Sequence, residues 1–213
     1  MNQKNLILIG GGGHCKSVID VAESAGYNIL GILDMPEEVG KSVLNYKVIG
    51  TDDDIPKYVD KAEFIITVGF IKNPAIRIRI YNRIKEVGGK LATIFASTAH
   101  VSRYATIGEG TVVMHQAVVN AGVQIGVNCI INTFTNIEHD AVVGDQCHIS
   151  TGTMVNGDSR RNCHSLEPFA IGKGINANAC YGIGNRYICE AFTTRKSIVI
   201  YFCTSGYYYV FKA

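Results

Sequence analysis

Between residues 101 and 160, aliphatic residues recur at every sixth position without a break. Ten consecutive hexapeptides begin with Ile or Val, and the fifth residue of each is small or mid-sized. This period predicts short strands that turn a corner every six residues, three to a coil, with the first and fifth side chains pointing inward. We therefore expect an all-β, left-handed parallel β-helix over residues 99–160. The first positions are Val101, Ile107, Val113, Val119, Ile125, Ile131, Ile137, Val143, Ile149 and Val155, and the fifth positions are Ala105, Thr111, Ala117, Val123, Cys129, Thr135, Ala141, Cys147, Thr153 and Ser159.

Apolar runs of a different kind precede the repeat. Residues 6–9, 29–33 and 63–68 are nearly continuous apolar segments. Such runs are typical of parallel strands, because these strands are covered on both faces of the sheet. The segment 91–94 is predicted to close the same sheet.

Helical segments alternate with these strands. Residues 14–25 predict one helix with its apolar positions on one face. Thr51 precedes three aspartates and predicts a second helix start, because these side chains suit a helix N-terminus. Asn73 and Pro74 predict the N-cap and first position of a third helix. This alternation predicts a small doubly wound, Rossmann-like α/β domain over residues 1–98.

The last part of the chain follows neither pattern. The repeat stops at Arg160 and Arg161, and residues 161–213 hold four of the seven cysteines and a dense aromatic run. A β-helix needs stacked coils and a cap at its end, and neither is recognisable here. Two interpretations are open: a divergent C-terminal cap, or a shift of the reading frame near residue 159.

Composition excludes several classes of function. The net charge is only +2 and no basic run occurs, which argues against nucleic-acid binding. No apolar run reaches membrane-spanning length, and the first run is too short for a signal peptide. The seven cysteines are odd in number and form no C-x-x-C pair, so we expect reduced thiols in a cytoplasmic protein.

A glycine loop is the first candidate site. A strand, four glycines at residues 10–13 and a helix start make an anion site, because free backbone N–H groups and the helix dipole favour phosphate. The dinucleotide fingerprint is incomplete, since Cys15 stands where its third glycine belongs, and Lys16 does so in the shifted frame. A nucleotide-linked substrate therefore fits this loop better than a redox cofactor. A tight turn without a ligand is the alternative.

Two further side chains accompany the loop. Asp34 ends the second predicted strand, where such folds hold a ribose hydroxyl or a base. His14 follows the loop directly. For His14, a role in packing or in starting the helix is as compatible with the sequence as ligand contact.

His139 is the second candidate site. It occupies the third position of its hexapeptide, near a corner, so its ring is expected to point outward. A neutral imidazole near its ordinary pKa suits general-base work at pH 7. An adjacent carboxylate can fix the tautomer and stabilise the imidazolium, and Glu138 and Asp140 are both candidates. The alternative is a surface or packing role.

Two more histidines flank this position in the sequence. His148 follows His139 by nine residues, about half a coil, and could reach the same groove across a subunit interface. His115 lies on another face and raises the possibility of a metal site shared between subunits. Such sites use a close pair of histidines, and no close pair occurs in this chain.

These motifs together resemble those of a known family. They are Gly-Gly-Gly-Gly-His at residues 10–14, Leu-Asp at 33–34, Gly-Thr-Asp-Asp at 50–53, and Ile-Glu-His-Asp at 137–140 followed by Gly-Asp at 144–145 and His148. Over residues 1 to about 158 the chain is similar to the sugar O-/N-acetyltransferase family of the sialic acid O-acetyltransferase type. Bacterial UDP-amino-sugar N-acetyltransferases belong to this family.

The resemblance implies an activity and an assembly. It implies a homotrimer whose active sites lie in grooves between neighbouring β-helices, with the nucleotide part of the substrate held by the N-terminal domain. It also implies transfer of acetyl from acetyl-CoA to an amine or hydroxyl of a nucleotide-linked amino sugar or a sialic acid. The acceptor attacks directly in a ternary complex, without an acyl-enzyme.

The resemblance also implies roles for single residues. His139 matches the catalytic base and Asp140 the residue that orients it, while His148 matches a contact to the acetyl carbonyl of the cofactor. The substrate-binding positions match Gly12, Gly13, His14, Asp34 and Asn132, the last of which lines the sugar pocket.

The chain departs from the family pattern after residue 158, where the family continues with coils that build most of the coenzyme A groove. The expected function is an acetyl-CoA-dependent acetyltransferase of surface-glycan synthesis that uses no metal. A non-catalytic, trimeric nucleotide-sugar-binding protein without a complete coenzyme A site is the alternative, and a metal-dependent hydratase is a third hypothesis.

Overall fold

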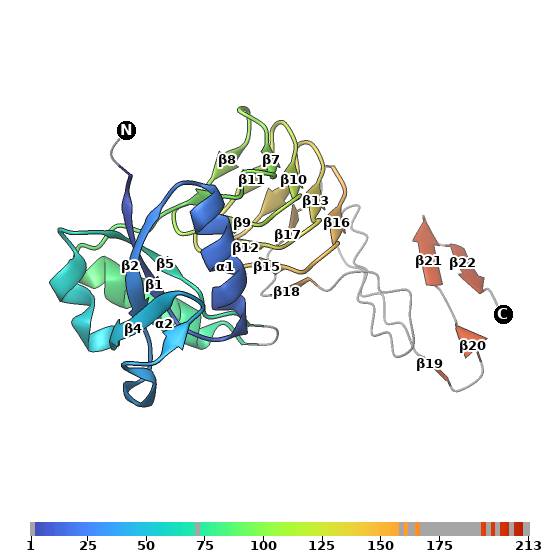
Figure 1. Cartoon of the computed structure of the whole chain (residues 1–213). Coiled ribbons are helices and arrows are strands. Elements are labelled where there is room, and N and C mark those ends of the chain that lie inside the picture. Colours follow the sequence, from blue (N-terminus) through green and yellow to red (C-terminus); the bar gives the residue numbers. More distant parts are fainter. Residues whose placement is uncertain are drawn as a thin grey trace.

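An α/β domain and a β-helix pack side by side in the computed structural model (Figure 1). The structure describes residues 3–70 and 73–157, and beyond these the backbone of a few short strands. Within the described residues, no helix is long and apolar enough to cross a lipid bilayer.

A five-stranded sheet forms the centre of the N-terminal domain, in the order β3-β4-β2-β1-β5. The predicted parallel strands are present, and β3 is the one antiparallel member of the sheet. The hairpin of β3 and β4 escaped the sequence prediction because β3 has only two residues and β4 interrupts its apolar residues with Lys47. The strands are β1 (Asn5–Ile9), β2 (Asn28–Leu33), β3 (Ser42–Val43), β4 (Tyr46–Gly50) and β5 (Glu63–Ile66).

Helices cover both faces of this sheet. Thr51 forms the expected capping box, in which its side chain accepts from the Asp53 N–H and Asp54 accepts from the Thr51 N–H. The third helix begins one residue later than predicted, at Ala75, although the Asn73 side chain does cap it by accepting from the Ala75 N–H at 2.8 Å. The helices are α1 (Gly13–Ser24), η1 (Pro36–Glu38), η2 (Asp52–Tyr58) and α2 (Ala75–Glu86).

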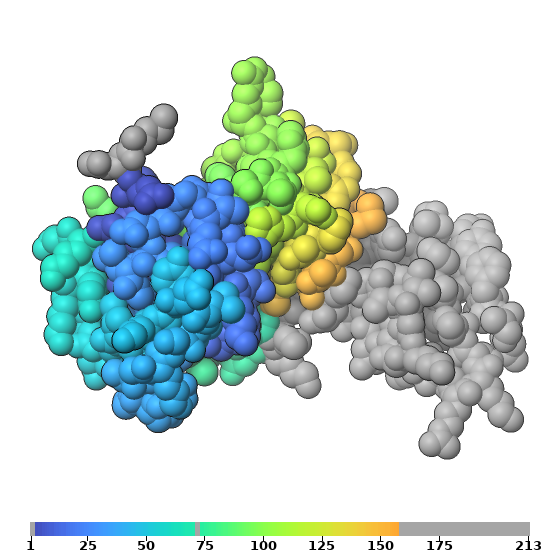
Figure 2. All heavy atoms as spheres, in the orientation of Figure 1, coloured from blue at the N-terminus to red at the C-terminus, as the bar shows by residue number. Residues whose placement is uncertain are grey.

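Strand β1 shows how the domain core is divided. Leu6 and Leu8 face α1, whereas Ile7 and Ile9 face α2 and η2, because successive side chains of a strand point to opposite faces. The core on the α1 side continues into the β-helix, where it includes Val112 and Ile130. Helix α1 therefore lies between the sheet and the β-helix (Figure 1), and the two parts share one core. Their surfaces adjoin in the space-filling view (Figure 2).

The repeat region forms the expected three-sided β-helix. Its first-position and fifth-position residues build one buried core, as predicted. One face joins β7 (His100–Val101), β10 (Val118–Val119), β13 (Asn136–Ile137) and β16 (Met154–Val155). The second joins β8 (Thr106–Ile107), β11 (Gln124–Ile125), β14 (Val142–Val143) and β17 (Arg160–Arg161), and the third joins β6 (Ile94–Phe95), β9 (Val112–Val113), β12 (Ile130–Ile131), β15 (His148–Ile149) and β18 (Ser165–Leu166).

Strand β6 corrects one prediction. Ile94 was expected to close the α/β sheet, but β6 pairs with β9 of the β-helix. Only Leu91 extends the α/β sheet, through a single bridge to Phe64. The reason is that Ile94 and Phe95 already stand in the six-residue phase of the repeat, one hexapeptide before Val101.

The corners of the β-helix repeat a backbone conformation. The fourth residue of successive hexapeptides has a positive φ of 52° to 76°. Glycine and asparagine adopt this conformation readily, whereas a bulky side chain is strained there. The residues are Gly110, Gln116, Gly122, Asn128, Phe134, Asp140, Gln146 and Gly152.

Beyond residue 157 the backbone of several strands is described. Arg160 and Arg161 pair with Val142 and Val143 in the regular register, but β18 pairs with β15 one residue short of a full coil. Two antiparallel pairs follow, β19 (Thr193–Thr194) with β20 (Ser197–Ile198) and β21 (Tyr201–Thr204) with β22 (Tyr207–Val210). The two interpretations of residues 161–213, cap or frame shift, fall mostly outside the described residues and stay predictions.

Candidate active site

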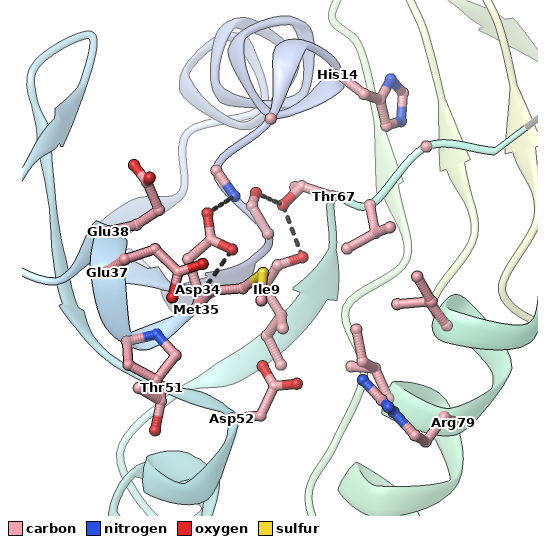
Figure 3. Close-up of a pocket in the computed structure, with 18 of the residues that line it drawn as sticks. Ile9, His14, Asp34, Met35, Glu37, Glu38, Thr51, Asp52, Thr67 and Arg79 are labelled. Atoms are coloured by element: carbon pink, nitrogen blue, oxygen red, sulfur yellow. Dashed lines mark hydrogen bonds between the residues drawn. The ribbon is translucent and has the colours of Figure 1, made fainter.

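A large pocket lies at the carboxyl ends of β1, β2, β4 and β5, and one wall is helix α2 (Figure 3). Its volume is about 960 Å³. The carboxyl edge of a doubly wound sheet is where such folds bind their ligands. Of the residues predicted from the sequence, the structure brings Gly12, Gly13, His14 and Asp34 together around this pocket.

The glycine loop is shaped by Asp34. One carboxylate oxygen accepts from the Gly11 N–H at 2.7 Å, and the other accepts from the Met35 N–H at 2.9 Å. A side chain on Gly11 would place its Cβ 2.6 Å from Asp34 Oδ2, so the Asp34 carboxylate would have to move away from the loop. By contrast, a Cβ on Gly12 or Gly13 would meet nothing within 4 Å, so the start of α1 faces open space.

His14 lies at the end of the pocket that is nearest the β-helix. Burial lowers the pKa of His14 to about 3, and the positive charges of Arg77 and His148 add to the effect. The ring is therefore neutral at pH 7. Its Nε2 atom is buried and has no hydrogen-bond partner among the described residues.

Arg77 joins the two parts of the molecule beneath this end of the pocket. Its side chain is only 1% exposed and donates to the carbonyl oxygens of Ile66, Val68 and Asn128. Burial lowers the pKa of Arg77 to about 9, so the guanidinium remains charged at pH 7. Sequence reasoning missed this residue, because an arginine within a helical pattern normally lies at the surface.

His148 and Asn132 meet at the junction between the two parts. His148 begins β15 and points out of the β-helix toward the N-terminal domain, where its Nδ1 lies 2.6 Å from the Phe70 carbonyl oxygen. The carbonyl can only accept, so Nδ1 carries the proton. Nε2 of His148 then accepts from the Asn132 amide at 3.3 Å. The Phe70 ring packs edge-on against the imidazole, with 5.6 Å between ring centroids.

His139 stands at a different corner, between β13 and β14. Its Nδ1 lies 2.9 Å from Asp140 Oδ2, and both side chains are more than 60% exposed. Asp140 has a φ of +60°, which turns its carboxylate back toward the ring. Glu138, the other candidate partner, is instead held by Asn136 and Asn120. Of the two candidate carboxylates, Asp140 is therefore the one within hydrogen-bond distance of Nδ1 of His139.

The structure does not bring His139 and His148 together within one chain. His139 lies at the corner between the faces of β13 and β14, whereas His148 starts a strand of the third face. In a three-sided coil, a corner lies opposite the third face. The α/β domain with its pocket also packs on that third face. One chain therefore carries two half-sites on opposite sides of its β-helix. The first is the pocket with His148, and the second is the His139–Asp140 pair.

The remaining candidates contact only their structural neighbours. His115 pairs with Asp20 of α1 at 3.2 Å and with Thr98 at 2.7 Å. Among residues 3–70 and 73–157, no group of three or more His, Cys, Asp or Glu side chains could hold a metal ion. Cys129 and Cys147 stack inside the β-helix, where the contact between them and burial raise the pKa of Cys129 well above its ordinary value.

Known proteins resemble this chain in both parts. Residues 5–84 match the family of the PglD N-terminal domain. The acetyltransferase domain of PglB from Neisseria gonorrhoeae FA1090 is 32% identical with a TM-score of 0.67, over 74% of this chain and 76% of that domain. The same domain in complex with acetyl coenzyme A is 31% identical with a TM-score of 0.70, over 78% of this chain and 80% of that one.

A more distant structure shares the fold. PerB from Caulobacter crescentus, in complex with CoA and GDP-perosamine, is 21% identical with a TM-score of 0.57. The match covers 73% of this chain and 90% of PerB.

Proposed function

The chain belongs to the hexapeptide-repeat sugar acetyltransferases, and on that premise we propose that it transfers acetyl from acetyl-CoA to a nucleotide-linked amino sugar or a sialic acid. The acceptor atom is an amine nitrogen or a hydroxyl oxygen. The observation that carries the proposal is the His139–Asp140 pair on a corner of the β-helix. The buried thiols of Cys15, Cys129 and Cys147, none of which forms a disulfide, support action in a reducing cytoplasm.

In the proposed reaction His139 acts as the general base. Asp140 accepts from Nδ1–H, which places the lone pair of the neutral ring on Nε2, the atom that takes a proton from the acceptor. The acceptor atom then attacks the thioester carbonyl carbon. The tetrahedral intermediate collapses, the carbon–sulfur bond breaks, and the imidazolium of His139 returns the proton to the leaving thiolate.

The substrate pocket supplies the acceptor. We propose that the nucleotide lies along the sheet edge by Asp34 and that its phosphates meet the start of α1 at Gly12, Gly13 and His14. Free N–H groups and the helix dipole favour anions there. The sugar then extends toward the junction of Phe70, Asn132 and His148.

A complete site requires two copies of the chain. Because His139 lies opposite the pocket of its own chain, we propose that it serves the pocket of a neighbour in a homotrimer. His148 would line the acetyl end of the cofactor in that groove. In the neutral ring Nδ1–H donates to the Phe70 carbonyl and Nε2 accepts from the Asn132 amide, so a hydrogen bond from His148 to the acetyl oxygen requires a protonated ring.

Replacing His139 tests the proposed base. We expect His139→Ala to lower kcat by about 10² or more, since general-base catalysis contributes 10²–10⁴-fold. His100→Ala is the matched control, because His100 is an exposed histidine on the same β-helix. Unchanged turnover in a folded His139→Ala variant would refute the assigned role.

A further inference from the structure

The carboxylates that line the pocket gather at one of its two ends. The strands β2 and β4 bring carboxylates to one end, whereas β5 and His14 form the other end, next to the β-helix. Figure 3 shows Arg79 on α2, across the pocket from four acidic side chains that define the carboxylate end: Asp34, Glu37, Glu38 and Asp52.

The carboxylate end is unsuited to a diphosphate. Glu37 and Asp52 face the pocket there, and like charges at short range repel. Burial raises the pKa of Asp52 above its ordinary value, although the positive charges of Arg83 and Arg79 act in the opposite direction. Ribose hydroxyls and base N–H groups, which donate hydrogen bonds, suit these carboxylates better.

Two arginines of α2 line the pocket, one helical turn apart, and only one of them is free. Arg83 pairs with Asp53 at 2.5 Å. Arg79 has no hydrogen bond or ion pair with any residue in the described part of the chain, although it lines the pocket. Its guanidinium is therefore available to a ligand, and such a group binds phosphate through two parallel N–H donors.

We propose that Arg79 binds the diphosphate of the nucleotide-linked substrate from the α2 side, opposite the glycine loop. This contact fixes the direction of the substrate. The base and ribose lie at the carboxylate end, and the sugar points past His14 toward the β-helix. The inference rests on the proposed function, because it takes the pocket to be the nucleotide-sugar site.

Calorimetric titration of the full chain separates the contributions of the parts of the ligand. The probes are uridine and UDP, with guanosine and GDP as the second series. We expect Arg79→Gln to weaken diphosphate binding by about 10- to 100-fold, the range for hydrogen bonds between charged groups, and to leave nucleoside binding unchanged. Arg79→Lys keeps the charge but loses the paired donors, so it should recover part of the affinity.

Arg103→Gln is the control for the change in net charge, since Arg103 is exposed on the β-helix and contacts Tyr104. Diphosphate binding that is unchanged in Arg79→Gln would overturn the inference. Equal losses for nucleoside and diphosphate would also overturn it, because Arg79 would then act on the base or on the fold. If the wild-type chain binds neither UDP nor GDP, the proposed substrate class fails as well.

Discussion

At the scale of single residues, burial lowers the pKa values of the basic side chains His14 and Arg77 beside the pocket. Burial and the charges of Arg77 and His148 keep His14 neutral, while Arg77 keeps its charge without a carboxylate partner among the described residues. The sequence does not predict the protonation state of either residue. The hydrogen bond from Arg77 of α2 to the Asn128 carbonyl of the β-helix joins residues that are 51 positions apart. It does predict that His14 and Asp34 line one pocket, since both follow strands of one parallel sheet.

The low pKa of His14 predicts a stability that falls in acid. Unfolded His14 takes up a proton below its ordinary pKa of 6.5, whereas the folded residue resists protonation until about pH 3. Stability from this residue is therefore nearly full at pH 7 and is lost as the pH falls, by about 3 kcal/mol between pH 7 and pH 4.5. Urea unfolding at pH 7 and pH 4.5 measures this loss.

The His14→Asn variant should lose about 3 kcal/mol less than the wild type over this interval. His100→Asn removes an exposed histidine and should behave like the wild type. Equal losses in His14→Asn and the wild type would show that His14 titrates normally in the folded chain.

At the scale of elements, the six-residue period predicts the β-helix almost completely. Its inward positions are set by the repeat alone, so the buried core follows directly from the sequence. The corners are less predictable. Gly122 and Gly152 suit a positive φ, but Phe134 adopts the same conformation only because the coils above and below impose it. The β3–β4 hairpin likewise depends on its packing beside β2.

One corner glycine supports the proposed base. Gly122 has a φ of +76°, and a Cβ there would lie 2.2 Å from Asp140 Oδ1. Gly122→Ala should therefore push Asp140 away from His139 and lower kcat by about tenfold or more. Steady-state acetyl transfer measures this effect.

Gly152→Ala is the matched control, because Gly152 has a φ of +71° and a Cβ there would meet nothing within 4 Å. Both substitutions should cost about 1–2 kcal/mol of stability from the backbone conformation. Only Gly122→Ala should lose turnover, and equal activities in the two variants would contradict the support of Asp140 by this corner.

At the scale of the whole molecule, two half-sites lie on opposite sides of one β-helix. The sequence indicates both through its motifs, yet their separation becomes visible only when the coils are assigned to faces. His148 faces the N-terminal domain, and His139 faces away from it. If copies share each site, two inactive variants should complement each other.

Mixed oligomers test this sharing. His139→Ala and Asp34→Ala should each be inactive alone, one lacking the base and the other the pocket. After unfolding and refolding together in equal amounts, about a quarter of the sites should combine an intact pocket with an intact base from a neighbouring copy. Activity that stays at the level of the separate variants would mean that sites are not shared.

The central claim is acetyl transfer from acetyl-CoA to a nucleotide-linked amino sugar or a sialic acid. Mass spectrometry of the acceptor tests it most directly, with the full chain, acetyl-CoA and a panel of UDP- and GDP-linked amino sugars and sialic acids. We predict one acceptor that gains a single acetyl group, with an equal release of free coenzyme A thiol, and no gain with His139→Ala. A folded chain that binds nucleotide sugars but acetylates none of them would contradict this account.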